Sequence, residues 1–349
     1  MKAITVTPLV EGSVGLEDIE EPDPASGSVL VQTVAVGVCG TDIEITSGQY
    51  GWAPSGSKKL VLGHESIGRV LEAPEGSGFV KGDFVVGIVR RPDPMPCYSC
   101  AAGEWDNCHN GMYVEHGIKE LDGFMRERYR ADANALVKVD PGLGKLGVLL
   151  EPTTIVAKAW EDVTRIGNRS HWEPKAVLIT GAGPVGLLAA LLGRQAGLEV
   201  HVIDQVTSGI KPELVSMIGA VYHATDMKEA VSSPDIIIEC TGVPALVFEA
   251  TQQIGTGGVV CLTGVSSAGH TTDIDVGLWN RDLVLSNKAI VGSVNANKRH
   301  YEAASEALSK APREFLEKMI TKSVPFTDYQ EAFNHGTQDV KVIIEFADI

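Results

Sequence analysis

The sequence lacks the features that mark membrane, secreted and nucleic-acid-binding proteins. It contains no apolar run that approaches the roughly 18–20 residues needed to cross a bilayer. Its first residues, MKAITVTPLVEG, have neither an apolar core segment nor a small-residue cleavage site, so we expect no secretory signal and a cytoplasmic location. Positive charge is scarce as well, because 29 Lys and Arg stand against 45 Asp and Glu, which gives a formal net charge of -16. Such a surface repels phosphate backbones and anionic lipids, so we expect neither nucleic-acid nor membrane partners.

Cysteine is also infrequent, with six among 349 residues, and three of the six lie close together. The six are Cys39, Cys97, Cys100, Cys108, Cys240 and Cys261. In a chain without a secretory signal, such clustering favours a metal site over disulfides. The length exceeds what one hydrophobic core usually serves, so two domains are expected.

The pattern of apolar residues changes near the middle of the chain. Up to about residue 140, Gly and Pro break short β-runs, which predicts mainly antiparallel structure. Beyond a helical stretch at 147–160, apolar strands alternate with helices, beginning with KAVLIT, which predicts a parallel doubly wound sheet. The tail returns to helices and one edge-like strand, KVIIEF. We therefore predict an α/β protein with a dinucleotide-binding domain at 156–300, inserted into a catalytic domain formed by 1–155 and 301–349.

A glycine motif follows the KAVLIT strand directly and opens a helix. Gly181 permits a tight turn, Gly183 lets the backbone approach a pyrophosphate, and Gly186 lets the helix pack closely on the strand. Pro184 and Val185 complete this G-x-G-x-x-G loop. The free N–H groups at the start of the helix favour phosphate binding. The strand, loop and helix together predict a dinucleotide site that these five residues form.

The end of the next strand, LEVHVI, indicates which dinucleotide is used. The strand is followed by Asp204, whose carboxylate can accept both hydroxyls of the adenosine ribose and would repel a 2′-phosphate. Residues 205–208 contain no arginine that could receive such a phosphate. NAD is therefore favoured over NADP, although the nearby Lys211 leaves some use of NADP open.

Two short segments in the first half of the chain carry metal-ligand residue types. Cys39 begins CGTD after a β-run, and His64 and Glu65 lie in GHESIG after another. A thiolate and an imidazole suit zinc, and a carboxylate can complete a set that leaves one position open for a substrate. Upstream of a dinucleotide motif, these segments predict a catalytic zinc.

The chain resembles the zinc-containing medium-chain dehydrogenases, and more narrowly their archaeal-type glucose dehydrogenase branch, over essentially its whole length. The similar segments are VGVCGTD, LVLGHE, the Arg-Arg-Pro at 90–92, EHGIKELDGFMRE, LLEPTTIVAKA and NKAIVGSVNA. The resemblance implies a GroES-like, mainly β catalytic domain and a Rossmann domain. It implies Cys39 and His64 as catalytic zinc ligands, with Glu65 and Glu151 as remaining ligands that alternate with water or substrate. It also implies that Thr41 passes the substrate proton outward.

The cysteine cluster resembles three of the four ligands of this family's structural zinc lobe. Cys97, Cys100 and Cys108 match the last three ligands, but Pro94 lies where the first would be. Three neighbouring side chains could replace it, namely Asp93, Asp106 and His109. Three thiolates and one oxygen or nitrogen form a closed tetrahedral site. We therefore expect a structural zinc with Asp93 as the provisional fourth ligand, or a loop with reduced cysteines and no metal.

Further positions correspond to substrate contacts in the sugar dehydrogenases. The resemblance implies that Glu115 binds the sugar, that Asn295 lies near both sugar and nicotinamide, and that Glu151 also touches the sugar. Ile155 and Leu285 depart from the residues that some members use, which leaves the identity of the sugar open. We expect the five tryptophans to be packing residues rather than sugar platforms.

These observations predict a zinc-dependent oxidoreductase that transfers a hydride from C1 of an aldose, with glucose the first candidate, to NAD. The resemblance implies a homodimer or a homotetramer. One alternative within the same class is a polyol or secondary-alcohol dehydrogenase. A different class, a zinc-free dinucleotide-binding protein such as a quinone reductase, requires the metal-type residues to be incidental.

Overall fold

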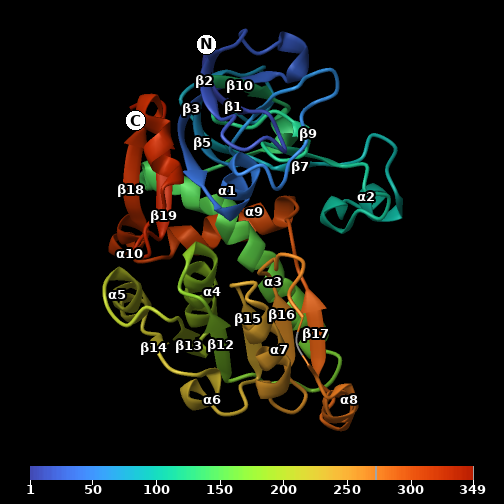
Figure 1. The fold of residues 1–349 in the computed structure, drawn as a ribbon. Helices are drawn as coiled ribbons and strands as arrows, with labels where there is room; N and C mark the ends of the chain where they lie inside the picture. Colours follow the sequence, from blue (N-terminus) through green and yellow to red (C-terminus); the bar gives the residue numbers. More distant parts are fainter. Residues whose placement is uncertain (272, 349) are drawn as a thin grey trace. The chain divides into compact units, whose positions relative to one another are not determined.

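The computed structural model describes residues 1–271 and 273–348, which form two compact units (Figure 1). The first unit contains Met1–Glu151, Ala296–Ser309 and Ile320–Ile349, and the second contains Pro152–Asn295 and Lys310–Met319. These limits lie within a few residues of the expected domain boundaries, apart from α10 (Arg313–Met319). This helix packs on α5 (Ile210–Met217) of the second unit, where Lys318 pairs with Glu213.

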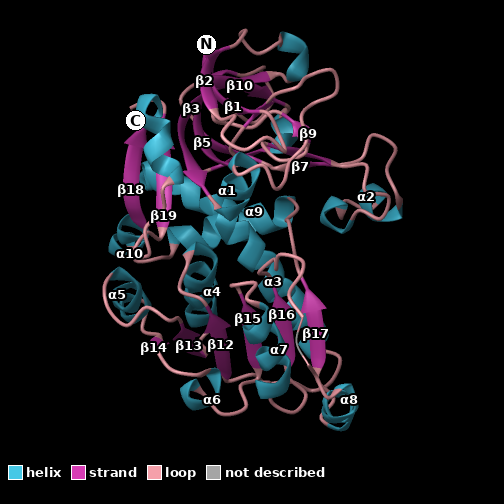
Figure 2. Ribbon diagram, in the orientation of Figure 1, coloured by secondary structure: helices cyan, strands magenta, loops and turns pink. Residues whose placement is uncertain are grey.

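The first unit is built mainly from β-structure (Figure 2). Its strands are β1 (Lys2–Val6), β2 (Gly15–Asp18), β3 (Val29–Val38), β4 (Leu60–Val61), β5 (Glu65–Glu72), β6 (Phe84–Gly87), β7 (Arg90–Arg91), β8 (Val114–His116), β9 (Glu120–Leu121), β10 (Arg128–Ala131), β11 (Leu136–Lys138), β18 (Ile320–Pro325) and β19 (Lys341–Glu345). The largest sheet has the order β11-β6-β5-β3-β19-β18, with β10 also paired to β3. Most ladders are antiparallel, as predicted, but β18–β19 and β8–β9 are parallel.

Short helices connect these strands. The α-helices are α1 (Gly40–Thr46), α2 (Tyr98–Ala101) and α9 (Lys298–Ser309), and the 3-10 helices are η1 (Pro24–Ser26), η2 (Trp105–Asn107), η3 (Ala133–Ala135), η4 (Pro141–Leu149) and η5 (Phe326–Phe333). The core between the strands is formed by buried Val, Ile and Leu together with Phe124, Met125 and Tyr129. Burial of this apolar surface is the main force that holds the sheet together.

The expectation that KVIIEF forms an edge strand was wrong. Strand β19 lies between β3 and β18, antiparallel to the first and parallel to the second. All its residues from Lys341 to Ile344 are buried. The strand begins with a lysine, and in the structure the buried carboxylate of Glu65 compensates the charge of Lys341.

The second unit is a doubly wound α/β domain (Figure 2). Its parallel sheet has the order β14-β13-β12-β15-β16-β17, from β12 (Ala176–Thr180), β13 (Glu199–Ile203), β14 (Val221–His223), β15 (Ile236–Glu239), β16 (Val259–Leu262) and β17 (Ala289–Gly292). Its helices, besides α5 and α10, are α3 (Leu150–Gly167), α4 (Pro184–Gln195), α6 (Met227–Ala230), α7 (Pro244–Gln253) and α8 (Val276–Leu285). This order is that of a Rossmann fold, in which continuous apolar strands such as β12 are covered on both faces.

The glycine motif occupies the turn between β12 and α4. Gly181 has a φ of 85°, a left-handed conformation that favours glycine. A Cβ atom at Gly186 would overlap the carbonyl oxygen of Gly181, so only glycine allows α4 to start so close to the strand. Helix α4 has Gly183 as its N-cap and Pro184 in its first turn, which suits the fixed φ of proline. The motif therefore produces the tight strand-to-helix turn that was predicted.

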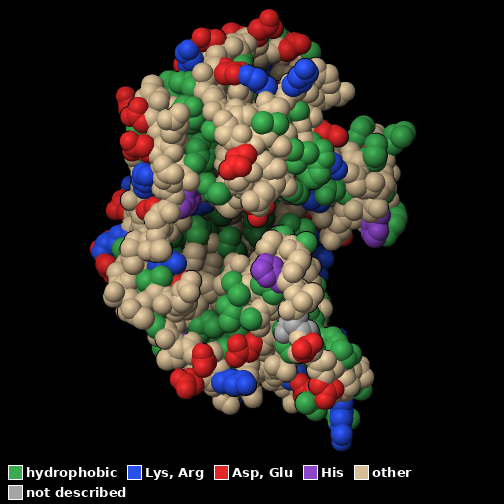
Figure 3. Space-filling model, viewed as in Figure 1, with side chains coloured by type: hydrophobic (Ala, Val, Ile, Leu, Met, Phe, Trp, Pro, Cys, Tyr) green, Lys and Arg blue, Asp and Glu red, His purple; other side chains and the backbone are tan. Residues whose placement is uncertain are grey.

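Acidic side chains are spread over the face of each unit that Figure 3 shows, rather than gathered in one patch. Among the residues that the structure describes, no helix is long and apolar enough to cross a membrane.

Candidate functional site

Three of the predicted zinc ligands meet in the first unit. Cys39 is the N-cap of α1, and its Sγ accepts a hydrogen bond from the backbone N–H of Thr41 at 3.3 Å. The same sulfur lies 3.1 Å from Nε2 of His64. One donor atom each from Cys39, His64 and Glu65 fall within 4.8 Å of one another. A sulfur, a nitrogen and an oxygen at this spacing match the donor types that zinc prefers.

Asp42 acts on two of these groups. Its Oδ2 accepts a hydrogen bond from the backbone N–H of Cys39 at 3.0 Å, and its Oδ1 lies 3.6 Å from Nδ1 of His64. Burial alone would lower the pKa of His64, but the Cys39 sulfur and the Asp42 carboxylate outweigh it and hold that pKa well above its usual value. At 3.6 Å these two atoms are beyond hydrogen-bond distance, so Asp42 acts on the His64 ring through its charge. Nε2 of His64 points toward the Cys39 sulfur, as it must if both atoms are to bind one metal ion.

Glu65 has a partner that the sequence did not reveal. Lys341 on β19 donates to both of its carboxylate oxygens, at 2.7 and 2.6 Å, and both side chains are almost completely buried. Gly37 makes room for this carboxylate, because a Cβ atom there would overlap Glu65 Oε2. Glu65 is therefore shared between the cluster and a buried ammonium group.

Glu151 heads α3 and is also buried, but it is not in the compact donor set. Burial raises the pKa of Glu151 to about 7; His64 acts against this shift and Glu65 adds to it. This carboxyl group thus senses the charges of the cluster and holds a proton more readily than an ordinary glutamate does.

The three clustered cysteines also come together. The sulfurs of Cys97, Cys100 and Cys108 lie within 4.8 Å of one another. Backbone N–H groups of His109 and Cys100 lower the pKa of Cys97 to about 6, with His109 donating at 3.4 Å. Burial and the neighbouring Cys108 and Cys97 raise the pKa of Cys100 to about 11. Three thiols in this arrangement need a cation to stabilise their joint ionisation.

The provisional fourth ligand of this lobe, Asp93, faces other groups. Its Oδ1 accepts the backbone N–H of Met95 at 2.8 Å, and its Oδ2 accepts the side-chain amide of Asn110. The alternatives are engaged as well, since Asp106 accepts a hydrogen bond from an asparagine and the His109 ring contacts a tyrosine hydroxyl. The donor set that the structure gathers consists of the three thiols alone.

Glu115, the predicted sugar-binding residue, is held by a buried arginine. Nε and Nη2 of Arg90 both lie 3.0 Å from Oε1 of Glu115, and both side chains are more than nine-tenths buried. Nη1 of Arg90 donates to the backbone oxygen of Asp106 at 3.1 Å, and its guanidinium lies 3.6 Å from the centre of the Tyr113 ring. Sequence reasoning did not assign a role to Arg90, whose position beside Glu115 follows from the pairing of β7 with β8.

Asn295 belongs to the second unit, where it follows β17 with a φ of 63°. Asparagine is among the few residues that tolerate this left-handed conformation. The preceding carbonyl, of Val294, accepts a hydrogen bond from the buried Lys158 at 3.0 Å. The loop that carries Asn295 is therefore fixed to α3.

Asp204 lies at the end of β13, opposite the glycine loop. Its Oδ2 accepts the backbone N–H of Ala182 at 2.7 Å, and its Oδ1 accepts that of Val206 at 3.1 Å. Lys211 Nζ also lies 3.3 Å from Oδ2. The carboxylate is thus oriented by the loop that is expected to hold the pyrophosphate.

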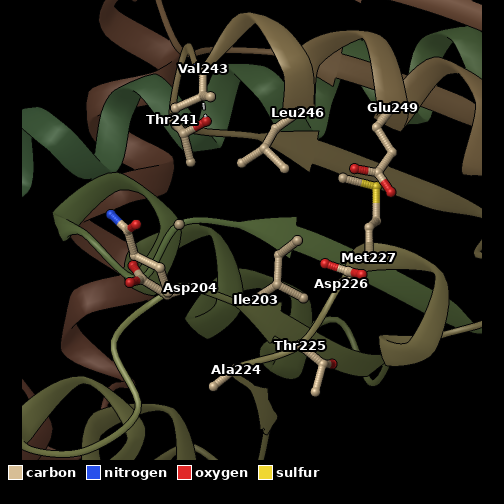
Figure 4. A pocket seen from close by; sticks show the side chains of 12 residues that line it. Ile203, Asp204, Ala224, Thr225, Asp226, Met227, Thr241, Val243, Leu246 and Glu249 are labelled. Atoms are coloured by element: carbon tan, nitrogen blue, oxygen red, sulfur yellow. Dashed lines mark hydrogen bonds between the residues drawn. The ribbon is translucent and has the colours of Figure 1, made fainter.

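A cavity of about 530 Å³ extends from Gly181 and Asp204 between β13 and α7 (Figure 4). Ile203 and Leu246 provide apolar walls, together with Met227, while carboxylates come from Asp204 and residues farther along the cavity. A flat aromatic base fits such walls, and it would follow a ribose bound at Asp204. Met227 and Leu246 could not be identified from the sequence, since they come from separate helices.

A buried carboxylate ties the loops beside this cavity together. Glu239, at the end of β15, is fully buried and accepts hydrogen bonds from the hydroxyl of Thr180 at 3.0 Å and from both N–H and hydroxyl of Thr241. The backbone N–H of Gly242 donates to it as well. The ends of β12 and β15 are therefore joined at the side of the sheet where Rossmann domains bind dinucleotides.

Comparison with known proteins agrees with this architecture. Residues 25–141 match the family described as the alcohol dehydrogenase GroES-like domain, and residues 144–346 match the family described as the glucose dehydrogenase C-terminus. A glucose 1-dehydrogenase of Methanocella arvoryzae is 38% identical over 356 aligned positions, and glucose 1-dehydrogenase 2 of Vulcanisaeta moutnovskia is 40% identical over 351. Each alignment covers 99% of both chains.

A solved structure is similar over the whole chain. The glucose dehydrogenase of Haloferax mediterranei, determined in complex with NADP, zinc and gluconolactone, superposes with a TM-score of 0.92 and 32% identity, and the match covers 100% of both chains. Similarity of this extent argues against the zinc-free alternative, in which the metal-type residues are incidental. The chain therefore belongs to the glucose dehydrogenase family within the zinc-dependent medium-chain dehydrogenases, and it is an oxidoreductase that acts on CH–OH groups with zinc and a nicotinamide cofactor.

Proposed function

We propose that this chain oxidises the C1 hydroxyl of a cyclic aldose to the lactone and passes the hydride to NAD, with glucose as the preferred sugar. The observation that carries the proposal is the buried Glu115 carboxylate, fixed by Arg90 in the same unit as the Cys39–His64 pair. The names of the relatives, glucose 1-dehydrogenases, support the choice of sugar. A polyhydroxylated ring needs such fixed partners, because a buried polar group without a partner is costly.

In this proposal Cys39 and His64 hold the catalytic zinc, with Glu65 and Glu151 as the remaining carboxylates. Zinc at such a site supplies Lewis-acid chemistry that lowers the pKa of the substrate hydroxyl. Thr41 passes the proton outward, and its position is set by its own N–H bond to the Cys39 sulfur. Asp42 places a negative charge beside the His64 ring.

Glu115 accepts hydrogen bonds from sugar hydroxyls away from C1, while Arg90 holds its carboxylate in place. We also propose that Asn295 contacts the nicotinamide and the sugar. In the structural lobe, Cys97, Cys100 and Cys108 would hold a second zinc, with Asp93 as a fourth ligand only if its bonds to Met95 and Asn110 are given up. We also propose that the chain forms a homodimer or a homotetramer and that it is cytoplasmic. Light scattering would measure the oligomeric state.

The second unit supplies the cofactor site. Gly181, Gly183 and Gly186, with Pro184 and Val185, form the pyrophosphate loop, and the neighbouring cavity accepts the adenine. Asp204 would bind the ribose hydroxyls and repel a 2′-phosphate, which favours NAD. The Haloferax relative was solved with NADP, so this preference is a property proposed for the present chain alone.

A substrate and cofactor screen tests the proposal. We expect glucose to be oxidised faster than galactose, xylose, sorbitol or ethanol, and kcat/KM with NAD to exceed that with NADP by at least about tenfold, or roughly 1.4 kcal/mol. Asp204→Ala should narrow this gap. Glu115→Gln should cost about 1–3 kcal/mol in kcat/KM for the sugar, because a charge-assisted hydrogen bond is weakened.

Each arm of the screen can fail separately. Equal efficiencies with NAD and NADP would contradict the role of Asp204 and point to Lys211. A preference for sorbitol or ethanol would instead support the polyol or secondary-alcohol alternative, and leave the family assignment intact. A preference for another aldose would contradict only the choice of glucose.

A further inference from the structure

Two aromatic side chains in the first unit remain open to solvent beside the loop that carries Glu115. Tyr50 is 39% exposed and Trp52 is 44% exposed, and their rings meet edge to face with centroids 4.9 Å apart. Trp52 is thus not the packing residue that the sequence suggested. Two aromatic rings that contact each other at the surface form a small apolar patch to which a ligand can bind.

We propose that Tyr50 and Trp52 form an aromatic wall of the aldose site. In this arrangement the Trp52 ring packs against the C–H face of the sugar, and the Tyr50 hydroxyl bonds a sugar hydroxyl that Glu115 also holds. The inference rests on the proposed aldose dehydrogenase activity and names further residues that determine its specificity.

The backbone holds this pair beside the Glu115 loop. The N–H of Trp52 donates to the carbonyl of Ile118 at 3.0 Å, and the N–H of Glu120 donates to the carbonyl of Trp52 at the same distance. Gly51 between the two aromatics has a φ of 101°, which favours glycine and sets the two rings on a sharp bend. The wall is therefore built into the β8–β9 turn and does not depend on a free loop.

The charge of the proposed sugar-binding carboxylate also acts on Tyr50. Burial and the Glu115 carboxylate raise the pKa of Tyr50, while Arg90 acts in the opposite direction. The Glu115–Arg90 pair therefore acts electrostatically on the Tyr50 phenol. A phenol with a raised pKa stays neutral at physiological pH and can donate a hydrogen bond.

The chemistry of this surface suits a carbohydrate better than a purely apolar ligand. A pyranose has a rim of hydroxyls and faces made of C–H groups, whose weakly positive hydrogens pack on the negative face of an aromatic ring. Here the Tyr50–Trp52 pair is joined through the backbone of Trp52 to the loop that follows the Glu115 carboxylate. Tyr113 adds a third ring, but it is covered by Arg90 at 3.6 Å and Lys119 at 4.2 Å, so it supports the polar side of the site.

Steady-state kinetics with glucose and saturating NAD test the wall. Trp52→Ala should raise the KM for glucose about tenfold while kcat changes little, because the lost contact is made equally in the ground state and the transition state. Trp52→Phe, which keeps a ring, is the matched control and should restore most of the affinity. Tyr50→Phe keeps the ring but removes the hydroxyl, and it should raise KM by a smaller factor.

Tryptophan fluorescence gives a reading that does not require turnover. Glucose should change the emission of the unaltered protein and of Tyr50→Phe, but not that of Trp52→Ala. An unchanged KM for glucose in Trp52→Ala would overturn the inference. So would a fall in molecular mass of that variant by light scattering, since the pair would then cover a second copy of the chain. Failure of the unaltered protein to oxidise any aldose would contradict the proposed function itself.

Discussion

The two cysteine-containing clusters of the first unit are built in opposite ways. The three thiols of the lobe lie within one short segment, Cys97 to Cys108. The backbone N–H groups that lower the pKa of Cys97 come from this segment and from His109 directly after it. The Cys39–His64–Glu65 cluster gathers residues from α1 and β5, and its carboxylate depends on Lys341, 276 positions away from Glu65. A local cluster can form before the fold is complete, whereas the second exists only when the whole sheet is assembled.

The largest effect should follow from Cys39→Ala. This change removes the sulfur that faces His64, so we expect kcat to fall by at least about a thousandfold, or roughly 4 kcal/mol. Binding of NAD, measured by calorimetry, should be preserved because the dinucleotide residues lie in the other unit. A variant that kept most of its rate would show that this cluster is not the reaction centre.

The next largest effect should follow from a change of Lys341, the distant partner of Glu65. Lys341→Met leaves the Glu65 carboxylate buried without its cation, which should cost about 3–5 kcal/mol of unfolding free energy in urea denaturation. The double variant Lys341→Met with Glu65→Gln should lose less, because no charge is then buried alone. Stability equal to that of the unaltered protein would mean that the ion pair does not hold the cluster together.

A smaller effect on catalysis is expected from the lobe. Cys100→Ala should remove one zinc ion per chain, as measured by metal analysis, and lower the melting temperature, because a structural site contributes folding energy. Its kcat should stay within about threefold of the unaltered value. A loss of activity as large as that of Cys39→Ala would contradict a purely structural role for the lobe.

The smallest expected effect concerns the reactivity of Cys97 compared with that of Cys240 and Cys261 in the metal-free protein. The pKa of Cys97 is lowered to about 6, so its thiolate should be alkylated by iodoacetamide from pH 6 upward. Burial raises the pKa of Cys240 and of Cys261 to about 12, so these thiols should remain unmodified. Peptide mass spectrometry measures both. Alkylation of Cys97 that began only near pH 9 would contradict the tuning by backbone N–H groups.

Features encoded locally could be predicted from the sequence. The glycine motif after a strand and the spacing of the three lobe cysteines involve residues only a few positions apart. The same holds for the alternation of apolar strands with helices, which predicts the parallel sheet. The partners Lys341 and Arg90 could not be found in this way, because strand pairing decides which side chains meet. The prediction that the tryptophans are packing residues was wrong for Trp52, which is open to solvent. The burial of Lys341, a charged residue, follows from its pairing with Glu65.

The position of β19 affects how the chain folds during synthesis. Its lysine also donates to the carbonyl of Val38, 303 positions earlier, at 3.4 Å. Strand β3 is synthesised early and β19 late. Nearly all of the second unit has therefore been synthesised before β19 can pair with β3 in the large sheet of the first unit. Contacts of such separation slow folding, and an incomplete sheet exposes pairing edges. We therefore expect nascent chains that stop before β19 to contain a folded second unit, while the first unit awaits its last strand and recruits chaperones.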